Sequence, residues 1–147
     1  MRAVITRVSS ASVGIGGVMH SNIGKGLLIL LGVSQQDTET QAEKVADRIC
    51  KLRIFEDTAG KMNIAPDKAG AQLLIVSQFT LYADCRQRRP GFSAAARPEK
   101  ADMLYELVIS RCREYGYTVA SGVFGADMQV SSVNDGPVTI IVDTDDI

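Results

Sequence analysis

Alternating apolar and polar positions dominate the first third of the chain and predict β-strands there. The stretches RAVITRV, from residue 2, and SVGI, from residue 12, alternate in this way, and Gly16 and Gly17 follow where a tight hairpin turn would fit. The segment VMHSNI then leads into GLLILLGV at residues 26–33. That run is apolar throughout, as expected of a central strand that is buried on both faces of a sheet.

A helical period replaces the strand pattern in two segments. Residues 37–52 carry apolar side chains at helical spacing, with Asp37 or Thr38 placed to cap the first turn. The second segment is Pro98–Tyr115, which opens on a proline suited to the first helical position and is followed by Gly116, where a left-handed cap would end the helix. Both helices are predicted to pack on the core through one apolar face.

The rest of the chain adds strands and polar loops. RIF at 53–55 and AQLLIVSQ at 71–78 are predicted strands with a polar loop between them, and residues 79–97 show no clear period. Three more strands are predicted, at 117–124, 128–133 and 138–143. The last two of them meet at an Asn-Asp-Gly-Pro corner. This order predicts an α/β (α+β) fold, a single domain over residues 1–147 with a mixed, mostly antiparallel sheet curled toward a barrel and two main helices packed on it.

Composition and missing motifs exclude several classes of function. The 16 basic and 17 acidic side chains nearly cancel, so a polyanionic partner would have to be held by a local patch. The phosphate-loop, dinucleotide-binding and zinc motifs are missing and the three cysteines lack metal-type spacing, so we expect no cofactor and no metal. The N-terminal residues do not form a signal peptide and the longest apolar run is too short to span a membrane, which predicts a cytoplasmic protein.

The best site candidate is the end of the strand at 71–78. Ser77, Gln78 and Thr80 bring two hydroxyl groups and an amide to a sheet edge, where α/β proteins often bind ligands. If the strand ends there, the N–H groups of Phe79 and Thr80 lose their ladder partners and can donate to an anion or a developing oxyanion. The same residue types also cap turns, so a structural role stays equally open.

Two further features carry candidate chemistry. Residues 85–100 hold an excess of four positive charges, which suits a phosphate backbone; a solvated loop is the alternative. Gly136 and Pro137 either enforce a sharp turn or present fixed carbonyl groups as a shape-selective wall for an amine. In residues 85–100 the only acidic side chain is Glu99, and the basic side chains are Arg86, Arg88, Arg89, Arg97 and Lys100.

Together, SQFTL at 77–81 and NDGPVT at 134–139 resemble, in order and separation, the two signature motifs of the D-aminoacyl-tRNA deacylases. The similarity extends through MRAVITRVSSASV, GKGLLILLGVS, RRPGFSAAARP and GVFGADMQVSSVNDGPVTI, and so covers essentially the whole chain. Ser132, Gly91 and Arg97 depart from the expected pattern. These departures bear on local packing and on the tRNA-facing surface, and they leave both motifs intact.

The resemblance implies a cytoplasmic homodimer that hydrolyses the ester between a D-amino acid, or glycine, and the terminal adenosine of tRNA, and that spares L-aminoacyl esters. Ser77, Gln78, Phe79 and Thr80 would form the floor that holds the terminal adenosine and the ester. The resemblance also implies that no membrane and no cofactor takes part.

The second motif would supply the chiral filter. Gly136 and Pro137, joined by a cis peptide bond, would enter the partner subunit's pocket, where their carbonyls accept the substrate amino group and leave no room for an L side chain. Arg7 would hold this corner in place, and Asn134 and Thr139 of the same motif are predicted to contact the substrate. The predicted tRNA contacts are Arg86, Arg88 and Arg89.

The sequence leaves the mechanism and two other functions open. Because the single histidine, His20, lies in a hairpin segment, we expect the 2'-hydroxyl of the terminal ribose to assist the reaction while backbone groups stabilise the oxyanion. Thr80 as a covalent nucleophile is the competing mechanism. A hydrolase of another small ester would keep the Ser77 and Thr80 pocket, and a non-catalytic nucleic-acid-binding dimer would need only the basic loop.

Overall fold

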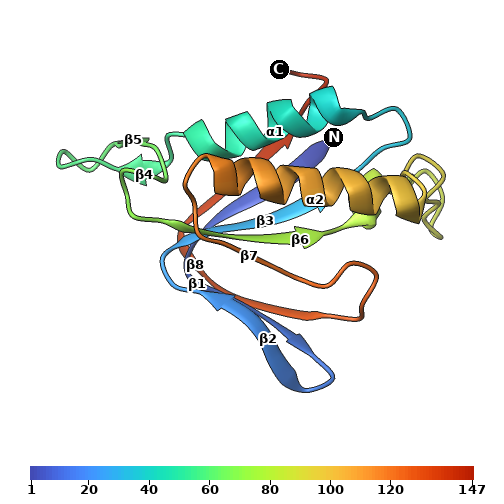
Figure 1. Cartoon of the computed structure of the whole chain (residues 1–147), viewed down its shortest axis with the longest axis horizontal. Helices are drawn as coiled ribbons and strands as arrows, with labels where there is room; N and C mark the ends of the chain where they lie inside the picture. Colours follow the sequence, from blue (N-terminus) through green and yellow to red (C-terminus); the bar gives the residue numbers. More distant parts are fainter.

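The computed structural model describes residues 1–147, in which six strands form one mixed sheet and two long helices lie side by side across one face of it (Figure 1). A separate two-stranded ribbon extends from the body beyond the first helix (Figure 1). The elements are β1 (Arg2–Ile15), β2 (Val18–Ile23), β3 (Gly26–Gly32), α1 (Glu39–Lys51), β4 (Phe55–Glu56), β5 (Met62–Ile64), β6 (Gln72–Ser77), the 3-10 helix η1 (Phe79–Tyr82), α2 (Pro98–Glu114), β7 (Val119–Ser121) and β8 (Gln129–Asp143).

Strand β1 organises the sheet because it is long enough to pair with three others. One edge pairs with β3 through its first half and with β2 through its second half, and the other edge pairs with β8, all antiparallel. The pairs β3–β6 and β6–β7 are parallel. With β2, the second half of β1 and the first half of β8 turned away from the helices, the sheet curls toward a barrel (Figure 1). The predicted fold class is confirmed.

The core lies between the sheet and the helices, as the helical periods predict. Both helices bury one stripe, and β3 is buried over nearly its whole length. Tyr105 of α2 is fully buried, and its hydroxyl donates a hydrogen bond of 2.8 Å to the carbonyl of Ile75 in β6. A buried tyrosine hydroxyl needs such a partner, so this contact fixes α2 over the strand that ends at the candidate site.

Two predicted segments differ from the structure. The polar loop after residue 56 contains β5, which pairs with β4 across a turn held by Asp57, whose carboxylate accepts the N–H groups of Ala59 and Lys61. The aperiodic stretch begins with η1, a helix too short to show a period. Of the two cap candidates, Asp37 and Thr38, the structure selects Thr38.

The largest difference concerns the predicted corner near the end of the chain, which is not a hairpin. Strand β8 runs unbroken through it and stays paired with β1 on both sides. The register shifts on either side of Val8, so Arg7 alone stands opposite residues 135–138. The extra residues of β8 bulge out of the ladder, as extra residues in one strand of an antiparallel pair must. The corner is thus a protrusion from a long strand that is anchored at both ends.

Candidate functional site

The first motif lies where β6 ends and the chain turns away from the sheet. The Gln78 N–H donates to the carbonyl of Leu31 at 2.8 Å, and the chain then enters η1. The first N–H groups of a helix have no intrahelical acceptor, so those of Phe79 and Thr80 point out of the turn without a helical partner. The Gln78 side-chain amide donates to the Thr80 hydroxyl at 2.5 Å. This strand end can therefore present two backbone donors to a ligand.

A cavity of about 700 Å³ opens beside this strand end. Ser77, Gln78 and Phe79 line it, whereas the Thr80 side chain does not. Phe79 is half-exposed and meets Phe92 edge to face, with 5.1 Å between the ring centroids. The remaining wall is mostly apolar, and sequence reasoning assigned no role to any of its residues except Arg97. Its apolar part comes from Val33, Val76, Phe92, Ala95, Ala96, Pro98, Ala101, Phe124, Ala126, Met128 and Val130, and its polar part includes Gln35, Ser93, Arg97 and Asp127. A cavity of this size and lining fits a planar ring with a small polar appendage.

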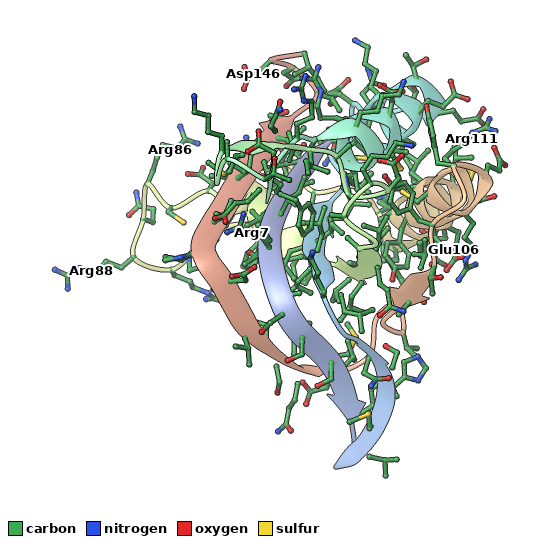
Figure 2. The ribbon with its side chains drawn as sticks, turned by 90° about the vertical axis from the view of Figure 1, so that its left-hand side faces the viewer. Arg7, Arg86, Arg88, Glu106, Arg111 and Asp146 are labelled. Carbon is green, nitrogen blue, oxygen red and sulfur yellow. The ribbon has the colours of Figure 1, made fainter.

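The predicted tRNA contacts lie on an exposed loop beside this cavity. Figure 2 shows that the loop with Arg86 and Arg88 extends away from the body of the molecule. Reciprocal backbone hydrogen bonds between Asp84 and Gly91 close the loop. Arg86 pairs with the Asp84 carboxylate through two nitrogens, which lowers the pKa of Asp84 and neutralises part of the loop's charge. Arg88 and Arg89 are exposed and form no ion pair.

The second motif is held by the side chain of Arg7 on β1 (Figure 2). The Arg7 side chain is almost fully buried; its Nε donates to the Asp135 carbonyl at 3.0 Å, and its Nη1 donates to the Ile54 carbonyl at 2.7 Å. The carboxylates of Asp135 and Glu56 lie 3.5 and 3.8 Å from the guanidinium. A planar guanidinium with several donors can hold two carbonyls at once. Arg7 thus ties the corner to the end of the chain segment that leads into β4.

The corner itself has a backbone that only glycine fits. Gly136 has φ of +134°, and a Cβ added there would lie 2.7 Å from the Val138 side chain and 3.2 Å from Nη2 of Arg7. The peptide bond between Gly136 and Pro137 is cis. Neither residue, nor Arg7, lines the cavity of its own chain. The two motifs are therefore not brought together within one chain.

The other two predicted substrate contacts lie beside the corner on β8. The Asn134 side-chain oxygen accepts a hydrogen bond from the Ser132 hydroxyl at 3.1 Å, and the Thr139 hydroxyl is 3.4 Å from that of Thr6. Both residues are exposed and, like the corner, do not line the cavity. They share the surface from which the corner protrudes.

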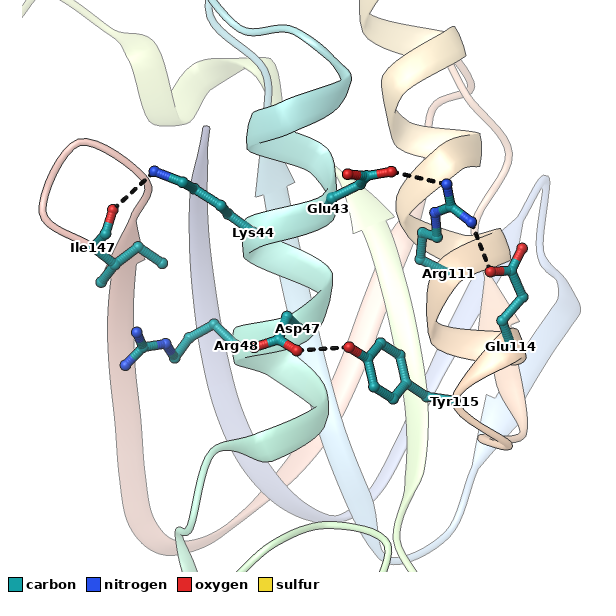
Figure 3. A pocket seen from close by; sticks show the side chains of 8 residues that line it. All are labelled: Glu43, Lys44, Asp47, Arg48, Arg111, Glu114, Tyr115 and Ile147. Carbon is teal, nitrogen blue, oxygen red and sulfur yellow. Dashed lines mark hydrogen bonds and ion pairs between the residues drawn. The ribbon is translucent and has the colours of Figure 1, made fainter.

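A second hollow, of about 620 Å³, lies on the outer side of the helices and is polar (Figure 3). Several of its charged groups pair with one another: Arg111 pairs with Glu43 and Glu114, both at 2.8 Å, and the Tyr115 hydroxyl donates to Asp47 at 2.6 Å. The hydrogen bond to Asp47 raises the pKa of Tyr115. These contacts tie α1 to α2, and none of the predicted site residues is among them. No group of three or more His, Cys, Asp or Glu side chains is placed to hold a metal ion.

Comparison with known proteins identifies the family. A family model described as D-Tyr-tRNA(Tyr) deacylase matches residues 4–143. The chain belongs to this deacylase family. It is accordingly an enzyme, a hydrolase, and the suspected resemblance is confirmed.

Relatives of the deacylase extend over nearly its whole length. A protein of Anaeromyxobacter dehalogenans named D-aminoacyl-tRNA deacylase is 54% identical over 98% of this chain and 97% of its own. A protein of the same name from Brevibacillus brevis is 53% identical over 98% of this chain and 100% of its own. Among solved structures, the c-Myc DNA Unwinding Element Binding Protein superposes with a TM-score of 0.93 at 39% identity, covering 98% of this chain and 99% of that one.

A more distant structure shares the fold alone. A chain described as a probable eukaryotic D-amino acid tRNA deacylase superposes with a TM-score of 0.81 at 16% identity, covering 96% of this chain and 97% of that one. None of the helices of the deacylase is long and apolar enough to cross a membrane.

Proposed function

We propose that this deacylase hydrolyses the ester bond of D-aminoacyl-tRNA, and of glycine misplaced on tRNA, releasing the free amino acid and intact tRNA. The terminal adenosine lies in the cavity beside Ser77–Phe79, and the ester lies over the N–H groups of Phe79 and Thr80. The size and mostly apolar lining of the cavity support this placement. The reaction takes place in the cytoplasm, where aminoacyl-tRNA is made and used.

The observation that carries the proposal is the separation of the two motifs. Gly136 and Pro137 are fixed by buried Arg7 but do not line the cavity of their own chain. They protrude from β8, whose residues 129–137 are all exposed and which has only one paired edge. A rigid corner in that position can complete a site only in a neighbouring molecule. We therefore place the active site between two subunits of a homodimer.

The surface of β8 supports a second copy as the occupant. Val130, Val133 and Ile141 are all at least one-third exposed, at 39%, 58% and 69%, on a strand whose outer edge carries unpaired backbone groups. An exposed apolar edge strand is a liability unless another chain covers it. In a two-fold dimer the same patch covers itself, and each corner then reaches the other subunit.

Chirality is sorted in this site by exclusion. The carbonyls of Gly136 and Pro137 accept hydrogen bonds from the substrate amino group, which orients the Cα of the amino acid. A D side chain then points to open space, glycine has none, and an L side chain meets the corner. Exclusion by clash suits this task because enantiomers bury the same atoms and attractive contacts discriminate poorly between them.

The reacting groups come from the substrate and the backbone. Water adds to the ester carbonyl, the carbonyl oxygen takes up negative charge, and the N–H groups of Phe79 and Thr80 donate to it. The neighbouring 2'-hydroxyl assists proton transfer, and the bond to the ribose 3'-oxygen breaks. Thr80 is poorly placed as a nucleophile, since its hydroxyl oxygen already accepts from Gln78 and His20 is exposed on β2.

Subunit mixing tests the shared site. A corner variant, Gly136→Val, and a cavity variant, Phe79→Asp, are each expected to have little activity with D-tyrosyl-tRNA. Mixed dimers of the two contain one intact corner facing one intact cavity, so random exchange restores about a quarter of the parental sites. Each variant mixed with itself is the control. Absence of any recovery in dimers shown to have exchanged would contradict a site built from two subunits.

A modified substrate tests the mechanism. We expect tRNA that ends in 2'-deoxyadenosine, charged through its 3'-oxygen, to bind normally and to be hydrolysed far more slowly. Thr80→Ala should retain most of the activity, because only the backbone N–H of this residue acts. An inactive Thr80→Ala enzyme, together with an acyl-enzyme trapped on the parent protein, would establish the covalent route instead.

A further inference from the structure

The 3-10 helix η1 is too short to hold its own position. Four residues of 3-10 helix have poor hydrogen-bond geometry and little cooperativity, so their placement depends on contacts with the rest of the fold. The hydrogen bond from Gln78 to Leu31 fixes where η1 begins. At its other end, the carbonyls of the last turn have no intrahelical partners and need donors from elsewhere in the fold.

Arg2 binds that end. Its Nη1 donates to the Leu81 carbonyl at 3.0 Å, and its guanidinium carbon lies 5.1 Å from the centroid of the Tyr82 ring. A cation at the last carbonyls of a helix and over an aromatic face is favourable on both counts. Arg2 therefore contacts two of the four residues of η1, from a strand that is distant in sequence.

Asp143 orients this arginine. Its Oδ2 accepts from Nε of Arg2 at 2.8 Å and lies 2.8 Å from Nη2, so two guanidinium nitrogens face the carboxylate while the third faces Leu81. Arg2 and Asp143 are direct partners in the ladder between β1 and β8. Asp143 is 9% exposed, whereas Arg2 is 40% exposed. The buried carboxylate thus sets the direction in which the longer, half-exposed side chain reaches.

Gly32 gives η1 a surface to rest on. A Cβ added at Gly32 would lie 3.0 Å from the Leu81 side chain, 3.1 Å from the Gln78 carbonyl and 3.3 Å from the Tyr82 ring. The motif therefore packs directly on the backbone of β3, at a distance that favours glycine. This close contact and Arg2 therefore hold η1 from two directions.

We propose that Arg2, oriented by Asp143, is a positioning residue for the reaction: it holds the end of η1 through Leu81 and Tyr82 and thereby aims the N–H groups of Phe79 and Thr80. This inference rests on the proposed function, because it assigns the catalytic donors to η1. Arg2 does not line the cavity and acts only through the helix that it holds.

Kinetics of Arg2→Gln test the role. A displacement of the donors weakens the enzyme's binding of the transition state more than its binding of the tRNA. We therefore expect kcat for D-tyrosyl-tRNA to fall about tenfold and KM to change less than twofold. Arg2→Lys, which keeps one charged donor, should recover part of kcat. The matched control is Arg113→Gln, which removes an arginine-to-carbonyl bond of 3.3 Å to Val119 away from η1, and is expected to leave both constants unchanged. A parental kcat in Arg2→Gln would overturn the inference.

A double variant and a spectrum separate positioning from a general loss of stability. If Asp143 acts through Arg2, then Arg2→Gln combined with Asp143→Asn loses no more kcat than Arg2→Gln alone, whereas independent effects would multiply and contradict the inference. The amide resonances of Phe79 and Thr80 should shift in Arg2→Gln and stay in place in Arg113→Gln. An inactive parent enzyme whose amides still shift with Arg2 would refute the proposed function and leave the positioning role standing; unmoved amides would refute the role itself.

Discussion

Replacing Arg7 by lysine removes the hydrogen bond from Nε to the corner and keeps the positive charge. The guanidinium reaches the Ile54 and Asp135 carbonyls through two different nitrogens, at 2.7 and 3.0 Å. Lysine has a methylene group where arginine has Nε, so the bond to the Asp135 carbonyl is lost in this geometry. One charge-assisted hydrogen bond is lost, which costs about 1.5–3 kcal/mol. If all of that free energy goes into the position of the corner, kcat/KM for D-tyrosyl-tRNA falls by about 10- to 150-fold.

The assay is release of labelled tyrosine from D-tyrosyl-tRNA, measured with Arg7→Lys beside Arg113→Lys. The second variant alters an arginine that donates to a carbonyl at 3.3 Å far from the corner, and is expected to retain parental kcat/KM. Circular dichroism and thermal unfolding establish that both variants fold. If folded Arg7→Lys keeps kcat/KM within twofold of the parent, the corner does not depend on Arg7 and the reasoning fails.

Three further results are expected. Exchanging both Arg88 and Arg89 for glutamine should weaken tRNA binding and reduce the slope of log Kd against log salt concentration by about two. Arg86→Gln should change that slope less, because the charge of Arg86 is already paired with Asp84, and an equal effect per arginine would contradict this reasoning. Gly136→Ala places a Cβ 2.7 Å from the nearest side-chain atom, so we expect at least a tenfold loss of kcat/KM for the D substrate; an unchanged value would show that the corner tolerates movement. Burial acts to raise the pKa of Asp143, but hydrogen bonds from Asp145 and Arg2 outweigh it and hold the pKa below 3.8. Its contribution to stability is therefore present above pH about 4 and is lost as pH falls through the lowered pKa, so urea unfolding should find Asp143→Asn less stable at pH 7 and the difference shrinking below pH 4.

The helices could be predicted because their signals are local. Each has an apolar stripe of helical period, and Pro98 and Gly116 mark the limits of the second within one residue. The corner could not be placed, because the turn residues around Gly136 suggest a hairpin, and only the pairing with β1, more than 120 residues away in sequence, keeps β8 continuous. Local turn chemistry was overruled by long-range pairing.

Only part of the candidate site could be predicted, because some of its residues come together through long-range contacts. The rule that ligands bind at strand ends located Ser77–Phe79, but the opposite wall of the cavity comes from Phe92 and from the segment around Phe124, which carry no chemical motif. The pairing of Arg86 with Asp84 was open to sequence reasoning, since the two are only two residues apart. Arg2 gave no signal, because its partners lie on η1 and at the far end of β8.

The central claim is that a backbone corner lent by one subunit excludes L-aminoacyl esters from the site of the other. The most direct measurement compares the rates at which the enzyme releases amino acid from D-tyrosyl-, L-tyrosyl- and glycyl-tRNA under single-turnover conditions. We predict rapid release of D-tyrosine and glycine and no release of L-tyrosine above the uncatalysed rate. Equal release of the two tyrosine enantiomers would contradict the claim.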